Sequence, residues 1–475
     1  MTTSEFSVAG LDGESVGLST TEVESLDSRL DGAVLRANDE GWDDATLVWN
    51  AMVAKTPALV VQPATTGDVA SAVTFARDKG LLLGIKGGGH NIAGLSMADG
   101  GMTLDMSRLR DVQVDLDKRL VQAGPGCLLK HVDAATQEHG LATVLGFVSE
   151  TGLAGLTLGG GFGYLTRRFG WTTDNLVEVE IVTADGEMKT ASSEANPDLF
   201  WALRGAGHNF GVVTRFTFRL HEVGPAITGG LIAWSAEYAD QVVTAYKDIT
   251  AAAPRELTMA MTMRLAPPMP FIPEEWHGKP IVGFIICHSG SNPEADLAAL
   301  RDLPDPIADV VMEKPYTAQQ SMIDMGDPKG LERFWKMEFL AGLSDEYFAN
   351  YVPEALKVPT PMSQSVTFHL AGRLNEHDDD DGAVGNRDAH YISGFSGTWP
   401  PGTPREPVIS WVRGSWEKIR RFSTGGNYVN FQVADDDSER TAAAYGKNFE
   451  RIQRTKAIYD PDNFFRVNRN ISPAP

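Results

Sequence analysis

Two glycine clusters constrain the fold of this chain more than any other feature of its sequence. The first, Gly87-Gly88-Gly89, follows the apolar stretch 81–86 and leads into His90 and Asn91. Because glycine adopts positive φ and allows close approach, the triplet predicts a loop whose amides converge on an anion such as pyrophosphate. It can equally mark only a tight turn. Neither cluster has the Gly-x-Gly-x-x-Gly spacing of a dinucleotide-binding βαβ unit, so we expect phosphate binding without a Rossmann fold.

The apolar patterns along the chain predict an α+β protein built from more than one core. Residues 51–223 alternate short strands and helices, beginning with a strand at 58–63 and a helix at 66–79. Strand-like stretches farther along are 280–287, 365–370 and 408–413, and helical ones are 236–253, 293–303, 345–355 and 438–459. We therefore divide the chain into an N-terminal segment (1–50), two domains (51–223 and 224–425) and a C-terminal segment (426–475).

The charge balance argues against nucleic acid as a partner. The chain has 41 basic and 63 acidic residues, for a formal net charge of −22, and it has no basic excess to displace counterions from a phosphate backbone. Acidic runs at 378–381 and 435–437 fit a halophile's solvated surface. They fit equally well an ordinary acidic protein whose net charge keeps it soluble.

Cysteine, histidine and apolar patterns exclude several other classes. Two cysteines, Cys127 and Cys287, form neither a disulfide framework nor a Cys-x-x-Cys metal motif, and the histidines lack metal-site spacing. A signal peptide has a basic segment followed by an apolar one, and the N-terminus of this sequence shows neither. The apolar stretches are far shorter than the roughly 20 residues that span a bilayer. We expect a cytoplasmic protein with no metal and no membrane partner.

The sequence around the glycine clusters resembles the FAD-binding domain of the vanillyl-alcohol-oxidase superfamily, specifically the berberine-bridge-enzyme-like FAD-linked oxidases. The motifs that carry the resemblance lie at 86–96, 151–163, 198–205, 209–214 and 459–468. The similarity is strong in the first domain and at the C-terminus and weak between 225 and 425. It implies an α+β fold with a two-subdomain FAD-binding domain and a substrate domain that contains an antiparallel sheet.

The resemblance also implies a covalent flavin. His90 stands where the family attaches the flavin 8α-methyl group to a histidine, although a lone histidine beside a turn is also compatible with a packed loop residue or a base. Relatives with a second attachment use a cysteine at the position of Val148, so we expect a single bond. The implied cofactor-binding residues are Lys86, Gly87, Gly88, Gly89, His90, Asn91, Ser96, Val148, Gly152, Gly155, Gly159, Gly160, Gly161, Gly163, Val213 and Asn468.

The catalytic residues depart from the family pattern. Many relatives carry Tyr-x-Asn-Tyr, whose second tyrosine is the base, but this chain reads Tyr428-Val429-Asn430-Phe431, and phenylalanine cannot take a proton. Tyr428 and Asn430 match and are predicted to line the flavin, although Tyr428 fits a packed strand equally well. Glu376 resembles a family carboxylate placed over the substrate and is the replacement base that we consider. Its acidic neighbours also fit a solvated loop.

Two charged residues in the second domain, Lys336 and Glu338, lie among aromatic ones. This mixture suits a pocket wall, and an amphipathic surface strand explains it as well.

The resemblance implies an oxidase for a small organic substrate. FAD would take a hydride from a C–H beside a hydroxyl or amine, and O2 would be reduced to hydrogen peroxide. Without the tyrosine base, we expect a neutral amine as substrate or a base such as Glu376. Two alternatives stay open: a dehydrogenase that uses another electron acceptor, and a non-catalytic protein that has kept the fold.

Overall fold

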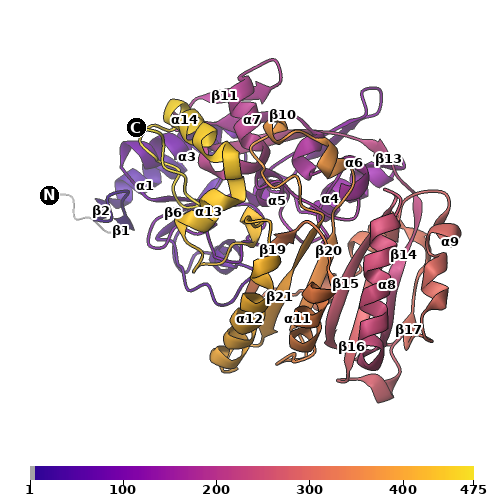
Figure 1. Ribbon diagram of the computed structural model, residues 1–475. Helices are drawn as coiled ribbons and strands as arrows, with labels where there is room; N and C mark the ends of the chain where they lie inside the picture. Colours follow the sequence, from indigo (N-terminus) through magenta and orange to yellow (C-terminus); the bar gives the residue numbers. More distant parts are fainter. Residues whose placement is uncertain (1–5) are drawn as a thin grey trace.

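Three β-sheets of four or more strands form the framework of the computed structural model, which describes residues 6–475 (Figure 1). The first has the order β3 (Ala33–Leu35), β4 (Leu59–Gln62), β6 (Met102–Asp105) and β5 (Leu83–Lys86). Its last three strands run parallel. Helix α3 (Thr66–Asp78) packs on the sheet and begins with a capping box between Thr65 and Asp68. The strand and helix predicted at 58–63 and 66–79 are confirmed.

The second sheet is antiparallel and has the order β11 (Met188–Ser192), β10 (Leu176–Val182), β12 (Val212–Arg219), β8 (Leu120–Ala123) and β7 (Val112–Asp115). Three helices share its apolar core: α4 (Leu129–Gln137), α5 (Leu153–Leu158) and α7 (Pro197–Ala206). Residues 87–91, which follow β5 of the first sheet, meet Gly152 at the start of α5, so the predicted anion loop lies where the first two sheets join.

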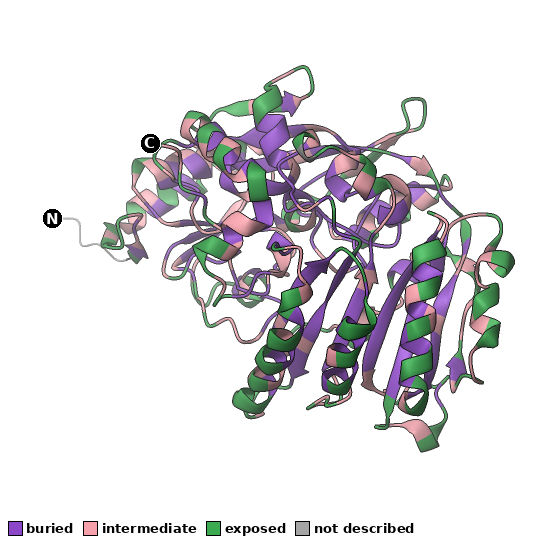
Figure 2. Cartoon of the chain, in the orientation of Figure 1, coloured by how far each residue is buried: buried purple, intermediate pink, exposed green. Residues whose placement is uncertain are grey.

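The third sheet is antiparallel and much larger. Its order is β17 (Ala308–Asp309), β14 (Ala226–Ser235), β16 (Pro280–His288), β15 (Leu257–Leu265), β20 (Gln364–His369), β21 (Tyr391–Trp399) and β19 (Glu332–Leu340), with β18 (Met312–Pro315) also on β14. Helices α8 (Ala239–Ala252), α11 (Asp345–Ala355) and α12 (Arg405–Ile419) cover one face (Figure 1). The strands are buried while the outer faces of these helices are exposed (Figure 2). The antiparallel sheet predicted for the second domain is confirmed.

The other elements are β1 (Phe6–Ala9), β2 (Ser15–Leu18), α1 (Thr20–Asp27), α2 (Trp42–Thr46), β9 (Leu141–Ala142), α6 (Thr166–Phe169), β13 (His221–Glu222), α9 (Pro293–Asp296), α10 (Tyr316–Gln320), α13 (Ser438–Tyr445) and α14 (Phe449–Tyr459). The chain end returns to the first sheet, where Phe464 and Phe465 enter its core. Within residues 6–475, no helix has the length and apolar character needed to cross a membrane.

Two local predictions are wrong. Residues 408–413, expected as a strand, lie inside α12. Val408, Val412 and Ile419 are buried, and their spacing places all three on the helix face that packs against the sheet. The single helix expected at 438–459 is two helices, because Gly446 adopts φ 53° between them.

A buried carboxyl links α4 to α10. Asp133 is 2% exposed and accepts a hydrogen bond from Gln320 Nε2 at 2.9 Å. Burial raises the pKa of Asp133 from 3.8 to about 7. Between these values the folded protein holds a proton that the unfolded chain has lost, so this residue's stabilising contribution falls as pH rises through that window.

The Asp133→Asn variant is therefore expected to have a larger free energy of unfolding than the wild type, by roughly 2–4 kcal/mol, at pH values above the pKa of about 7 in the folded protein. At a pH near the ordinary aspartate pKa of 3.8 the two proteins are expected to be equally stable. Gln320 Oε1 has no partner within the described residues, so its amide can turn to accept from the new asparagine. Urea unfolding at several pH values measures the difference. Glu138→Gln, at the exposed end of the same helix, is the control. An Asp133→Asn variant with the wild-type pH profile would contradict this assignment.

Candidate functional site

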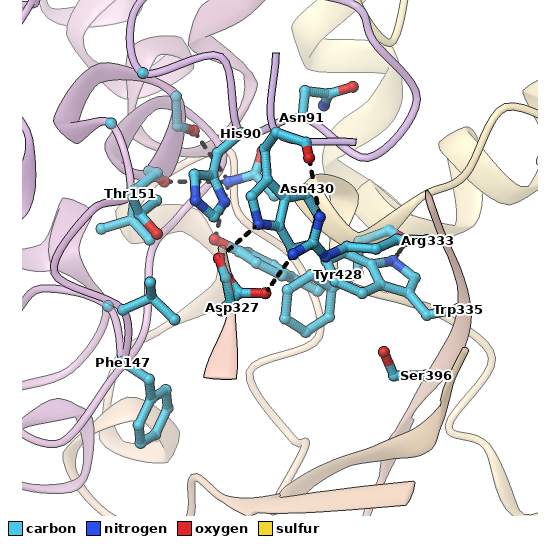
Figure 3. Close-up of a pocket in the computed structure, with 18 of the residues that line it drawn as sticks. His90, Asn91, Phe147, Thr151, Asp327, Arg333, Trp335, Ser396, Tyr428 and Asn430 are labelled. Atoms are coloured by element: carbon cyan, nitrogen blue, oxygen red, sulfur yellow. Dashed lines mark hydrogen bonds and ion pairs between the residues drawn. The ribbon is translucent and has the colours of Figure 1, made fainter. Parts of the chain in front are cut away.

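A cavity of about 420 Å³ lies between the first glycine loop and the face of the large sheet opposite its helices. Figure 3 shows His90 of the glycine loop, Trp335 of β19, and Tyr428 and Asn430 of one turn near the C-terminus converging on it. Of the predicted cofactor-binding residues, those that line it are Gly87, Gly88, Gly89, His90, Asn91, Ser96, Val148, Gly152, Gly155, Val213 and Asn468. Segments far apart in the sequence thus form one continuous wall.

The first glycine loop has the geometry of an anion site. Within residues 6–475, no hydrogen bond is found for the backbone N–H of Gly88, Gly89, His90 or Asn91. A Cβ on Gly88 would lie 2.5 Å from the nitrogen of Gly152, so only glycine lets the two loops meet. Asn91 Oδ1 accepts from the N–H of Ala93 and Leu95, both at 3.1 Å, and fixes the turn that follows. Consecutive free amides beside a cavity fit a pyrophosphate group.

Five predicted cofactor-binding residues stand behind the wall rather than in it: Lys86, Gly159, Gly160, Gly161 and Gly163. Lys86 Nζ lies 3.6 Å from Asp105 and donates to the carbonyl of Ala45 at 2.8 Å, so its role is to brace the loop. A Cβ on Gly159 would overlap the Asn430 side chain. The second glycine cluster therefore makes room for protein groups, and its direct contact with the cofactor stays a prediction.

His90 lies in an aromatic and cationic setting. Its ring stacks on Trp49, with centroids 4.6 Å apart and planes 19° apart, and the guanidinium of Arg333 lies 4.0 Å from the Trp49 ring. Burial, and secondarily the charge of Arg333, lower the pKa of His90 to about 3. The imidazole is therefore neutral at neutral pH, which leaves one ring nitrogen with a free lone pair.

Trp49, Arg333 and Asp327 are site residues that the sequence analysis did not find. Arg333 donates to the carbonyl of Trp49 at 2.9 Å and pairs with Asp327 at 3.4 Å. Trp49 Nε1 donates to the Asp327 carbonyl at 3.3 Å. These residues come from the N-terminal segment and from β19 with its preceding loop, and no local motif marks them. Their contacts join the two halves of the cavity beside His90.

Tyr428 and Asn430 both line the cavity and contact each other, and their place along the flavin stays a prediction. The Tyr428 hydroxyl accepts from Asn430 Nδ2 at 2.9 Å and from the Gly161 N–H at 3.0 Å. Burial raises the pKa of Tyr428 above its usual range, so the phenol keeps its proton. Asn430 Nδ2 also donates to the Gly155 carbonyl at 3.0 Å. Phe431 stands in the wall beside Trp335, with ring centroids 5.0 Å apart.

The expectation that Glu376 lies over the substrate is wrong. Its side chain is partly exposed outside the cavity, paired with Arg373 at 2.9 Å and with Arg255. It lies in a short turn, Arg373–Glu376, held by hydrogen bonds from Asn375 to two carbonyls farther along the chain. The carboxylate therefore serves a surface ion-pair cluster.

Lys336 and Glu338 do not line the cavity either. Side chains on a strand alternate between its faces, and it is Trp335 and Met337 of β19 that reach the cavity. Lys336 points the other way and pairs with Asp435 and Asp436 at 2.8 and 2.7 Å. Glu338 accepts from Trp416 of α12 at 2.6 Å. Both are buried, so the alternative of a surface strand is also wrong.

Comparisons with known proteins agree with this geometry. Residues 57–192 match the family model described as an FAD binding domain, and residues 427–472 match the model described as berberine and berberine like. The two matches cover the glycine loops and the segment that carries Tyr428 and Asn430. An FAD-linked oxidoreductase from Dictyostelium discoideum is 30% identical over 454 residues, which are 94% of this chain and 95% of the relative.

Solved structures share the whole architecture. The crystal structure of a nicotine oxidase (6-hydroxy-D-nicotine oxidase) from Arthrobacter nicotinovorans superposes with a TM-score of 0.85 at 26% identity, over 94% of this chain and 98% of that one. Glucooligosaccharide oxidase from Acremonium strictum gives a TM-score of 0.82 at 22% identity over 95% and 99%. That structure's description names a cysteinyl, histidyl FAD. At this identity the second likeness speaks for the fold alone.

Proposed function

This chain belongs to the berberine-bridge-enzyme-like FAD-linked oxidoreductases, and from that premise we propose that it is an oxidase with FAD attached to His90 alone. It is an oxidoreductase enzyme by its family. The observation that carries the finer proposal is the neutral His90 ring at the end of a loop of free amides. The oxidase activity named for its structural neighbour supports the choice of oxidase over dehydrogenase.

The residues present fit FAD. Besides the free amides of 88–91, Ser96 Oγ and Asn468 Oδ1 are buried atoms of the cavity with no hydrogen-bond partner within residues 6–475. Such atoms are rare in proteins unless a ligand or water satisfies them. When bound, FAD supplies the two-electron acceptor for a substrate hydride and passes both electrons to O2, which leaves with two protons as hydrogen peroxide.

The side chains around the cavity limit how the flavin is held. His90 has the free lone pair with which its nitrogen would bond the flavin 8α carbon. Forming that bond would release a proton from the ring N–H and one from the methyl group, leave the electron pair of the broken C–H bond on the flavin, and need O2 to remove that pair. Val148 lines the cavity where relatives with two attachments carry a cysteine, and it has no nucleophilic atom. We therefore expect one covalent bond, with the other contacts to the cofactor made by backbone amides.

The cavity offers no tyrosine base for deprotonation of a substrate. Tyr428 keeps its proton and Phe431 has none to exchange. The cavity's carboxylate within the described residues, Asp327, is paired with Arg333 beside His90, and burial raises its pKa to about 7, so it is half protonated at neutral pH. A substrate C–H beside a neutral amine needs no strong base, because the nitrogen lone pair assists hydride departure. We therefore favour an amine over an alcohol as the donor.

The oxidase proposal can be tested without knowing the substrate. The purified protein is reduced with dithionite under argon, mixed with air-saturated buffer, and its visible flavin absorbance and peroxide are followed. We expect reoxidation within seconds, with one peroxide formed per flavin. Slow reoxidation by O2 together with rapid reoxidation by an artificial acceptor would make the enzyme a dehydrogenase. A colourless protein that takes up no added FAD would overturn both assignments.

A further inference from the structure

The cavity has two chemically different parts. Near the glycine loops its sheet face is apolar, with Phe368, Val366 and Ile285. Phe368 packs against Phe147 and Phe162, with centroids 4.9 and 5.4 Å apart. Farther along the strands the same face becomes polar. The polar residues there are Thr262 and Arg264 of β15, Gln364 of β20, and Ser396 and Thr398 of β21.

Arg264 is the cation of this polar part, and its charge is unmatched. No ion pair to it is found within residues 6–475, and its Nε is buried without a partner. Its recorded hydrogen bond, from Nη2 to the carbonyl of Pro361, is long at 3.4 Å. Burial lowers the pKa of Arg264, and no carboxylate in the described part of the chain opposes this effect. A buried guanidinium atom without an acceptor is costly and calls for a ligand to pair with it.

The other cavity arginines are already engaged by the protein. Arg333 pairs with Asp327 and donates to the Trp49 carbonyl. Arg469 donates to the carbonyls of Gln432 and Val433, at 2.5 and 2.6 Å. Arg333 and Arg469 also keep a buried Nε without a partner within residues 6–475, but both donate short hydrogen bonds from their terminal nitrogens. Arg264, whose recorded bond is the 3.4 Å one to Pro361, is thus the least engaged of the three.

Strand register places Arg264 well away from His90. Arg264 faces Gln364, Gln364 faces Ser396, and Ser396 faces Trp335 on successive strands. Three strand spacings separate Arg264 from Trp335, which is about 14 Å across the sheet. Trp335 in turn touches Trp49, the residue stacked on His90. Val366 and Phe368 follow Gln364 on the same face of β20, and Phe368 touches Phe162, which in turn touches Tyr428. A substrate that reaches from Tyr428 to Arg264 therefore lies along the apolar part of the cavity.

We propose that Arg264 binds a carboxylate on the substrate, and that the carbon oxidised lies at the other end of an apolar body packed on Val366 and Phe368. A guanidinium presents paired donors that match a carboxylate. The apolar walls favour an aromatic or alicyclic body. The inference rests on the proposed function, because it names the substrate class of the same cavity.

Binding measurements on the flavin-loaded enzyme test this inference. The probes are hydrocinnamate and hydrocinnamamide, together with longer phenylalkanoates and their amides, and the flavin's visible absorbance reports binding. We expect the best-fitting acid to bind about 10- to 100-fold more tightly than its amide, as charge-assisted hydrogen bonds allow. Arg264→Gln is expected to abolish this preference, and Arg264→Lys to retain part of it. Arg219→Gln, an exposed arginine of β12, is the matched control.

The outcomes separate this inference from the proposed function. If no acid in the series binds more tightly than its amide, or if Arg264→Gln keeps the preference, Arg264 is not a carboxylate site. Flavin content and reoxidation by O2 are measured on the same preparations. A normal flavoprotein oxidase without the preference loses only this inference, whereas a protein without flavin loses the proposed function.

Discussion

Replacement of His90 by alanine is expected to abolish covalent flavin attachment while FAD still binds. On a denaturing gel the wild-type band should fluoresce, and its intact mass should exceed that of the chain by one FAD. The His90→Ala band should be dark, and its mass that of the chain alone. The free amides of Gly88, Gly89 and Asn91 belong to the backbone, so the variant is expected to bind FAD that denaturation releases.

The physical reason lies in the protonation and orientation of the ring. Attack on the 8α-methyl carbon needs an imidazole with a lone pair, and burial together with Arg333 holds the pKa of His90 at about 3. Stacking on Trp49 fixes the plane of the ring. His208 also lines the cavity, and its Nε2 lies 3.3 Å from the Gly155 carbonyl, which makes His208→Ala the matched control. A His90→Ala protein that keeps its flavin through denaturation would assign the attachment to another residue.

Features that depend on local chemistry could be predicted from the sequence. The loop at 87–91 was predictable because three glycines after an apolar strand have few uses besides a turn or an anion site. The start of helix α3 was predictable from Thr65 and Asp68, whose side chains cap its first turn. Tyr428 and Asn430 were found by their resemblance to a family motif, and both reach the cavity.

What could not be predicted depends on contacts between distant segments. Trp49 and Arg333 are 284 residues apart, and only the folded chain shows that they enclose one side of His90. The choice between Trp335 and Lys336 as wall residues turns on which face of β19 meets the cavity. A shift of the strand by one residue would turn Lys336 toward the cavity and Trp335 away from it. The local pattern of aromatic and charged residues does not show which of the two arrangements the strand adopts.

The predictions for Glu376 and for the segment 408–413 were wrong for different reasons. Glu376 matched a short pattern, but the turn that holds it is fixed by Asn375 and faces Arg255 and Arg373 at the surface. Residues 408–413 carry valines that favour strands in isolation. In the folded protein these valines lie on the face of α12 that packs on the large sheet, so tertiary packing overrides the local strand propensity.

Gly88→Ala is expected to have the second large effect, the loss of flavin binding itself. Its Cβ would lie 2.5 Å from the Gly152 nitrogen and 2.6 Å from the Gly152 Cα. Both are backbone atoms, so no side chain can turn aside to relieve the overlap. Either the first loop or the start of α5 must shift, and the free amides then no longer converge on one anion. Overpacking of this kind also costs about 1–3 kcal/mol of stability.

The ratio of visible to ultraviolet absorbance after FAD saturation and desalting measures this effect, and thermal unfolding measures the stability. The matched control is Gly414→Ala, in the middle of α12, where a Cβ meets nothing within 4 Å. That variant should load FAD as the wild type does and gain up to about 1 kcal/mol from helix propensity. If Gly88→Ala loads FAD normally, the two loops can separate without cost, and the anion site cannot depend on their contact. If it loses flavin while its unfolding stays close to that of Gly414→Ala, the contact serves the cofactor more than the fold, because the strain then falls on a loop that stabilises little else.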